Sequence, residues 1–206
     1  MIETFSLSSA YLYQDAWASQ ARLRYKIFVK QRGLPHTHFD GLEYDEFDTP
    51  SAVYLVWRDE DRHVRGLVRL LRTDRPYMLK SYWPHLVANG ELPESERVWE
   101  ITRVCVDKDV APATRKVILP SLLAAVDEFF VGCGAVGMIG VTLPHLLSYF
   151  IREGVQWLGT PATIEGRLER AFFVPSQHVR PHHHCHRYRI PRPVLSWPSD
   201  HAKDAA

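Results

Sequence analysis

The sequence lacks any apolar run approaching the roughly eighteen residues that a helix needs to cross a membrane. Its opening stretch, MIETFSLSSAYLYQDAWASQ, carries acidic and polar side chains where a signal peptide needs a basic start and an apolar run. Cysteine is scarce: Cys105, Cys133 and Cys185 are odd in number and widely spaced, which argues against a disulfide framework. We therefore expect a cytoplasmic protein without a membrane partner.

An excess of charge of either sign is also missing. Lysine and arginine number 25 against 24 aspartates and glutamates, a net charge of +1, and no helix with clustered basic residues is visible. A nucleic-acid partner is therefore not expected. The 206 residues, 46% hydrophobic and 24% charged, have the composition of a soluble globular protein. They predict one domain over 1–206, with a core at about 10–190 and a flexible C-terminal tail.

Hydrophobic periodicity predicts alternating helices and strands. Helices are expected over 16–33, 113–134 and 144–154, with a short helix or turn over 81–90, and strands over 51–58, 64–72, 97–106, 135–142, 155–159 and 169–176. The acidic and aromatic segment 36–50 is expected to be a loop. This order of elements is typical of a mixed α/β sheet with helices on its faces.

The strand 97-RVWEITRVCV-106 places two charged residues among apolar ones. Because side chains alternate along a strand, Glu100 and Arg103 should point to opposite faces. They can share a face if a β-bulge, a feature common near active sites, re-aims the chain between them. The alternative is an edge strand with two solvated charges.

Other charged residues stand beside apolar neighbours in the same way. Arg24 and Arg69 could lie along apolar surface, and the acids of 36–50 could cap turns. Taken together, however, the motifs resemble one family, the acyl-homoserine-lactone synthases of bacterial quorum sensing, from about residue 20 to residue 175. The motifs in chain order are Arg24-x3-Phe28, Glu43-x-Asp45-x2-Asp48, Arg69 in GLVRLLRT followed by PYML, and Trp99-Glu100-x2-Arg103.

The resemblance implies both a fold and a reaction. The fold is a three-layer αβα sandwich with a mixed central sheet, similar to the GCN5-related N-acetyltransferases, in which the strands near 97–106 and 135–142 splay apart around the acyl-pantetheine. The reaction transfers an acyl group from acyl carrier protein (acyl-ACP) or acyl-CoA to the amino group of S-adenosyl-L-methionine (SAM). Lactone closure then releases methylthioadenosine. SAM is a substrate, and no tightly bound cofactor is implied.

The resemblance also assigns candidate catalytic residues. Glu100 is the candidate base for the amine, since a buried carboxylate can act as a base near neutral pH. Arg24, Arg69 and Arg103 are candidates to hold the methionine carboxylate through the planar guanidinium fork, and the division of labour between them stays open.

The remaining acids and an aromatic ring complete the implied SAM site. Asp45 and Asp48 would attract the cationic groups of SAM or anchor the arginines, and Phe28 could offer its ring to the sulfonium or adenine. The chain departs from the family at Leu34, because the family usually has a tryptophan six residues after the Phe28 position. This departure weakens the aromatic wall expected around SAM. The implied SAM-binding set is Arg24, Phe28, Leu34, Asp45, Arg69 and Arg103.

Contacts with the acyl donor are implied in the second half of the chain. The acyl tunnel would be lined by Met138, Val141, Thr142, Leu146 and Phe150, each of which could instead be plain core. The hydroxyl of Thr142 could recognise an oxygen on C3 of the acyl chain. Arg115 and Lys116, at a helix start, could bind the phosphopantetheine. A patch that could dock an acidic carrier protein comprises Arg115, Lys116, Arg152, Arg167 and Arg170.

Three alternatives are weighed against this interpretation. The segment 182-HHHCH-186 suggests zinc, but we expect a strand here, whose residues alternate between faces and cannot all converge, so no metal is expected. An N-acetyltransferase acting on another amine would need a glycine-rich pyrophosphate loop, where this chain has 109-DVAPATRK-116. A catalytically silent sensor of acyl thioesters or SAM would not need both Glu100 and Arg103.

Overall fold

The computed structural model describes residues 1–13, 15–145, 154–179 and 181–198. The chain divides into two compact units. The first consists of Met1–Arg69, Arg103–Phe129 and Pro181–Ala206, and the second of Leu70–Thr102 and Phe130–Arg180. The strands β5 (Val64–Arg72) and β6 (Val98–Val106) each contribute residues to both units.

The first unit is built on strands in the order β11-β1-β4-β5-β6. β11 is parallel to β1, and β1 is antiparallel to β4. Its further elements are β1 (Ile2–Phe5), η1 (Leu7–Tyr13), α1 (Ala16–Arg24), the π-helix η2 (Tyr25–Gln31), β2 (His38–Phe39), β3 (Leu42–Glu43), β4 (Val53–Arg58), α3 (Pro112–Gly132), α5 (Pro181–Tyr188) and β11 (Leu195–Ser196).

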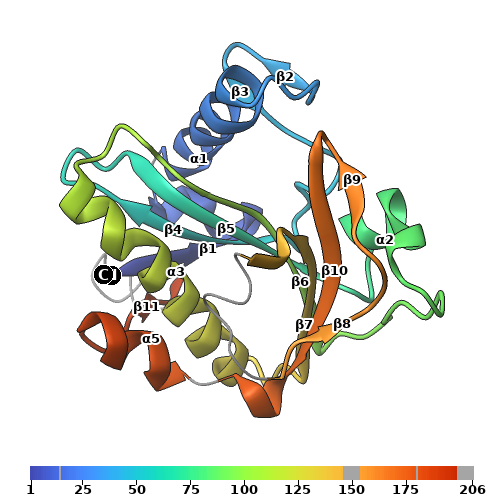
Figure 1. The fold of residues 1–206 in the computed structure, drawn as a ribbon. Helices are drawn as coiled ribbons and strands as arrows, with labels where there is room; N and C mark the ends of the chain where they lie inside the picture. The colour runs from blue at the N-terminus through green and yellow to red at the C-terminus, as the bar shows by residue number, and fades with distance from the viewer. Residues whose placement is uncertain (14, 146–153, 180, 199–206) are drawn as a thin grey trace. The chain divides into compact units, whose positions relative to one another are not determined.

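Helix α3 packs on the sheet of the first unit at a glycine. Figure 1 shows α3 lying across β4 and β5. A Cβ added at Gly66 in β5 would overlap the Cγ2 atom of Ile118 and lie 3.1 Å from Leu122 Cδ1. Both α3 side chains are completely buried. Glycine at this position therefore lets the helix approach the sheet closely.

The second unit continues the mixed arrangement with strands in the order β6-β7-β10-β8, and β9 pairs with β10 (Figure 1). β6 and β7 are parallel, whereas β10 is antiparallel to β7, β8 and β9. Its further elements are α2 (Met78–Tyr82), η3 (Pro84–Leu86), β7 (Gly137–Thr142), β8 (Gln156–Trp157), β9 (Ala162–Ile164), β10 (Arg167–Pro175) and η4 (Ser176–His178).

Strand β6 loses its regular geometry in the middle. Its parallel register with β7 runs from Val98–Gly137 to Ile101–Gly140. Two residues later the backbone of Arg103 has φ +51°, a left-handed conformation that is uncommon for a residue with a side chain. The alternation of faces expected between Glu100 and Arg103 is therefore interrupted at Arg103. The alternative of an edge strand with two solvated charges is wrong, because Glu100 is 1% exposed.

Most predicted elements are confirmed, with local differences. The predicted helix 16–33 is an α-helix to Arg24 and a π-helix beyond it, and Gly33, with φ +68°, follows its end. The expected loop 36–50 contains the short β2–β3 hairpin. The strands β1 and β11 were not expected from the sequence. The predicted helix 144–154 falls largely outside the described residues.

The expected strand at 182–186 is wrong, because these residues belong to α5. Pro181 opens this helix, a position where proline costs no hydrogen bond. His184 and Cys185 are buried together on it, and Cys185 O accepts the backbone N–H of Ile190 at 2.9 Å. In the described part of the chain, no helix is long and apolar enough to span a membrane.

Candidate active site

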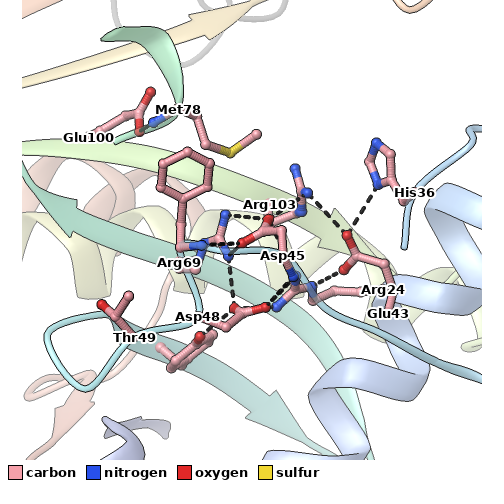
Figure 2. A network of polar contacts seen from close by, with 12 residues as sticks. Arg24, His36, Glu43, Asp45, Asp48, Thr49, Arg69, Met78, Glu100 and Arg103 are labelled. Carbon is pink, nitrogen blue, oxygen red and sulfur yellow. Dashed lines mark hydrogen bonds and ion pairs between the residues drawn. The ribbon is translucent and has the colours of Figure 1, made fainter. Parts of the chain in front are cut away.

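Arg24, the last residue of α1, is buried without exposed side-chain surface. Its Nε donates to Glu43 Oε2, and Nη1 and Nη2 donate to the two carboxylate oxygens of Asp48 at 2.7 and 2.9 Å. Nη1 also donates to Gln20 Oε1, one helical turn earlier, at 3.4 Å. Carboxylates thus hold the guanidinium on two edges (Figure 2), which offsets the cost of burying its charge.

The spacing Glu43-x-Asp45-x2-Asp48 is that of a tight turn after β3. Asp48 Oδ2 accepts the backbone N–H of Asp45 at 2.8 Å, and Asp45 Oδ1 accepts the backbone N–H of Phe47 at 2.9 Å. Phe47 is 2% exposed and anchors the turn in the core. Side-chain bonds to the nearby backbone are what aspartate contributes to turns. The turn therefore helps to fix the orientation of both aspartate side chains.

Arg69 enters the same cluster from β5 and is also completely buried. Its Nη1 and Nη2 donate to the two oxygens of Asp45 at 2.6 and 2.9 Å, and Nη1 also donates to Asp48 Oδ1 at 2.8 Å. Tyr54 on β4 donates its hydroxyl to Asp48 Oδ1 at 2.5 Å. Asp48 consequently joins Arg24, Arg69 and Tyr54.

Arg103 reaches the cluster from the irregular part of β6. Its Nη2 donates to Glu43 Oε1 at 3.0 Å and to Asp45 Oδ2 at 2.6 Å. Its guanidinium carbon lies 5.4 Å from the centre of the Phe28 ring, within the range of a cation–π contact. The Arg103 side chain is 9% exposed, whereas those of Arg24 and Arg69 are 0% exposed.

The charges in this cluster balance and stabilise one another. Burial opposes ionisation of Glu43, but the hydrogen bond from His36 and the charges of Arg103 and Arg24 outweigh it and lower the pKa of Glu43 to about 2. Burial likewise opposes ionisation of Asp48, and its bond and proximity to Arg24 hold the pKa of Asp48 well below its usual range. Both carboxylates are therefore ionised at neutral pH.

The structure adds three side chains that were not selected from the sequence. Gln20, Tyr54 and His36 all contact the charged cluster, and His36 Nδ1 lies 3.1 Å from Glu43 Oε1. Gln20 stands one helical turn before Arg24, a spacing that could have suggested a contact. Tyr54 and His36 are brought in by long-range packing, for which the sequence carries no local signal.

Glu100 is held within the second unit by the start of α2. Its Oε2 accepts the backbone N–H of Met78 at 2.8 Å, and its Oε1 accepts that of Leu79 at 2.7 Å. Met78 and Leu79 end the PYML motif, so this motif and Glu100 form one unit of structure.

The sequence of the chain is similar to those of known proteins. The family model described as autoinducer synthase matches residues 9–180. The chain belongs to the autoinducer synthase family. It is 35% identical over 161 residues to the acyl-homoserine-lactone synthase of Ralstonia nicotianae, covering 75% of this chain and 78% of that protein. The family and the enzyme class expected from the sequence, an acyl-homoserine-lactone synthase, are confirmed.

The fold of the chain is similar to those of solved structures. The coenzyme-A-dependent acyl-homoserine lactone synthase BjaI, solved with SAM and isopentyl-CoA, has a TM-score of 0.84 and 28% identity, with 98% of this chain and 99% of that chain covered. An acyl-CoA N-acyltransferase from Pseudomonas aeruginosa has a TM-score of 0.56 and 17% identity over 84% of this chain and 99% of that one, which shows similarity of fold. The expected mixed α/β fold class is confirmed.

The candidate acyl-chain residues of this synthase do not all lie on one face. Met138, Val141 and Thr142 are in β7, where Met138 and Thr142 share a face and Val141 points to the other. Strand geometry therefore brings two of them together. The other two candidates, Leu146 and Phe150, lie outside the described residues.

The basic residues selected for the donor differ in their surroundings. Arg115 and Lys116 are exposed in the first turns of α3, and Arg115 Nη1 donates to Lys108 O at 2.8 Å. Arg170 in β10 is half-buried, with its guanidinium carbon 4.9 Å from the centre of the Trp157 ring and its Nε bonded to Gly159 O. Arg167 is exposed, and Arg152 lies outside the described residues.

Proposed function

We propose that this synthase acts in the cytoplasm, acylates the amino group of SAM and closes the product to an N-acyl-L-homoserine lactone, with an acyl-coenzyme A as donor. The observation that carries the proposal is the cluster of three arginines and three carboxylates, in which the side chains of Arg24 and Arg69 are fully buried and that of Arg103 is partly exposed. The family of the chain supports the reaction.

Arg103 is the arginine that we assign to the methionine carboxylate. The guanidinium groups of Arg24 and Arg69 are each paired bidentately with an aspartate, Asp48 and Asp45 respectively. Taking up a second carboxylate would require these buried pairs to separate, which is costly. Arg24 and Arg69 therefore act as supports, and Asp45 and Asp48 anchor them.

The reaction consists of two bond exchanges. The SAM amine attacks the thioester carbon, the thiolate of coenzyme A leaves, and the amine loses a proton, for which Glu100 is the proposed base. The methionine carboxylate then attacks its own γ-carbon, and the carbon–sulfur bond breaks to release methylthioadenosine. The sulfonium is a good leaving group, so the main requirement of the second step is orientation of the carboxylate. Arg103 would provide that orientation.

The similarity to a coenzyme-A-dependent synthase over nearly the whole chain supports the donor assignment. Met138 and Thr142 would contact the acyl chain from β7, and Arg115 and Lys116 would contact the phosphates of the donor. To test the donor, the purified chain is incubated with SAM and matched acyl-CoA and acyl-ACP thioesters, and products are identified by mass spectrometry. An acyl-homoserine lactone formed faster from acyl-CoA supports the proposal. Preference for acyl-ACP contradicts the donor assignment, and absence of any lactone contradicts the function.

Replacement of Arg103 by lysine tests the division of labour. Lysine keeps the charge but lacks the planar fork, so we expect Arg103→Lys to raise the KM for SAM by about tenfold or more and to leave the KM for the acyl donor unchanged. Arg69→Lys should instead lower the thermal midpoint, because it breaks a buried bidentate pair. An unchanged KM for SAM in Arg103→Lys would indicate that another arginine binds the methionine carboxylate.

A further inference from the structure

His36 lies between η2 and β2 and contacts two parts of the candidate SAM site. Its Nδ1 is 3.1 Å from Glu43 Oε1, and its ring centre is 5.8 Å from that of Phe28, with the planes inclined by 33°. The His36 side chain is 13% exposed. Figure 2 shows its ring directed at the Glu43 carboxylate. His36 therefore combines a polar contact and an aromatic contact in a largely buried position.

The carboxylate that His36 contacts connects Arg24 and Arg103. Glu43 Oε1 accepts a hydrogen bond from Arg103 Nη2 at 3.0 Å, while Glu43 Oε2 accepts one from Arg24 Nε. The oxygen that His36 contacts is thus one of two carboxylate oxygens that accept from Arg103 Nη2, the other being Asp45 Oδ2 at 2.6 Å. A rotation of the Glu43 carboxylate would move one of the two acceptors that orient the Arg103 guanidinium.

The aromatic contact bears on the same guanidinium. The Phe28 ring has the guanidinium carbons of Arg103 and Arg32 at 5.4 and 5.5 Å from its centre. Leu34 is buried, and its backbone N–H donates to Phe28 O at 3.0 Å. His36 supplies a ring beside Phe28 two residues later.

We propose that His36 is a positioning residue for SAM binding. Its Nδ1 orients the Glu43 carboxylate and its ring supports the Phe28 ring. Through these two contacts His36 helps to fix the Arg103 guanidinium. This inference rests on the proposed function, in which Arg103 holds the methionine carboxylate. The part of the ligand that His36 would help to position is the amino-acid end of SAM.

Two replacements separate the polar contact from the aromatic one. His36→Phe keeps a ring and removes the nitrogen, whereas His36→Asn places an amide nitrogen close to the position of Nδ1. His38→Asn is the matched control, since His38 is exposed on β2 and its ring rests on Tyr25. The KM for SAM, the KM for acyl-CoA, kcat and the thermal midpoint are measured for each variant.

We expect His36→Phe to raise the KM for SAM by about tenfold with a change in kcat below about threefold, because it removes a hydrogen bond to a charged group. His36→Asn keeps a nitrogen near Glu43 but lacks the ring, so its KM for SAM should lie between those of the wild-type chain and His36→Phe. The KM for acyl-CoA should stay constant in all variants. A His36→Phe enzyme that matches His38→Asn overturns the inference while the proposed function stands. A wild-type chain that binds no SAM overturns both.

Discussion

At the scale of single residues, the site is governed by the cost of burying charge. The Arg24 and Arg69 side chains are 0% exposed, and each is matched by carboxylates within hydrogen-bond distance. Pairing raises the pKa of Arg24 even though burial opposes it. A buried ion pair adds little net stability, but losing one partner leaves an uncompensated charge. Single residues of this cluster are therefore far more sensitive to replacement than surface charges.

Asp48 is the residue at which this sensitivity should be largest, because it bonds Arg24, Arg69 and Tyr54 together. We expect Asp48→Ala to lower the free energy of unfolding by about 3–5 kcal/mol. Glu60→Gln, a change at an exposed acid, should alter it by less than about 0.5 kcal/mol. Urea denaturation monitored by tryptophan fluorescence measures both. Equal small effects would show that the cluster relaxes around the missing charge.

At the scale of elements, close packing depends on small residues and on irregular backbone. Gly66 allows α3 to approach β5, and the left-handed backbone of Arg103 ends the regular part of β6. The π-helix η2 follows directly on α1, so that Arg24 and Phe28 lie on either side of the change in winding. Such irregularities are common at functional sites.

The contact of Gly66 with Ile118 gives a prediction for the packing of α3. Gly66→Ala should lower the free energy of unfolding by about 1–3 kcal/mol, because its methyl group overlaps Ile118 Cγ2 in a buried interface. Ile118→Leu removes that methyl branch and keeps the side-chain volume. In a double-mutant cycle the pair should therefore cost less than the sum of the single changes. Strict additivity would mean that the strain lies elsewhere.

At the scale of the whole molecule, ionisable groups act on stability in opposite directions. The pKa values of Glu43 and Asp48 are lower in the folded chain than in the unfolded chain. Their ionisation therefore stabilises the fold at a pH above the pKa values of the unfolded chain. This stabilisation is lost as the pH falls, for Glu43 toward about 2. Burial and the charge of Glu128 raise the pKa of Asp127 to about 7. Its contribution is present at low pH and is lost as the pH rises to about 7.

Asp127→Asn tests the second of these effects. Asp127 on α3 is 7% exposed and its Oδ2 lies 4.0 Å from His184 Nε2 on α5. Between pH 5 and pH 8 the wild-type chain should lose on the order of 2 kcal/mol of stability relative to Asp127→Asn, which lacks the ionisation. Denaturation midpoints across this range provide the measurement. Parallel curves for the two proteins would mean that His184 in its charged form stabilises the carboxylate.

The sequence by itself determined the family, the order of the main helices and strands, and the acids and arginines of the site. It could do so because hydrophobic periodicity is local and because motif spacing identified the family. The tertiary structure decided which arginines form bidentate pairs with aspartates, and it placed His36 and Tyr54 beside the charged cluster. It also made α5 helical and paired β11 with β1. These features depend on contacts between distant residues, such as the one across 60 positions between Arg103 and Glu43, whose partners no local pattern specifies.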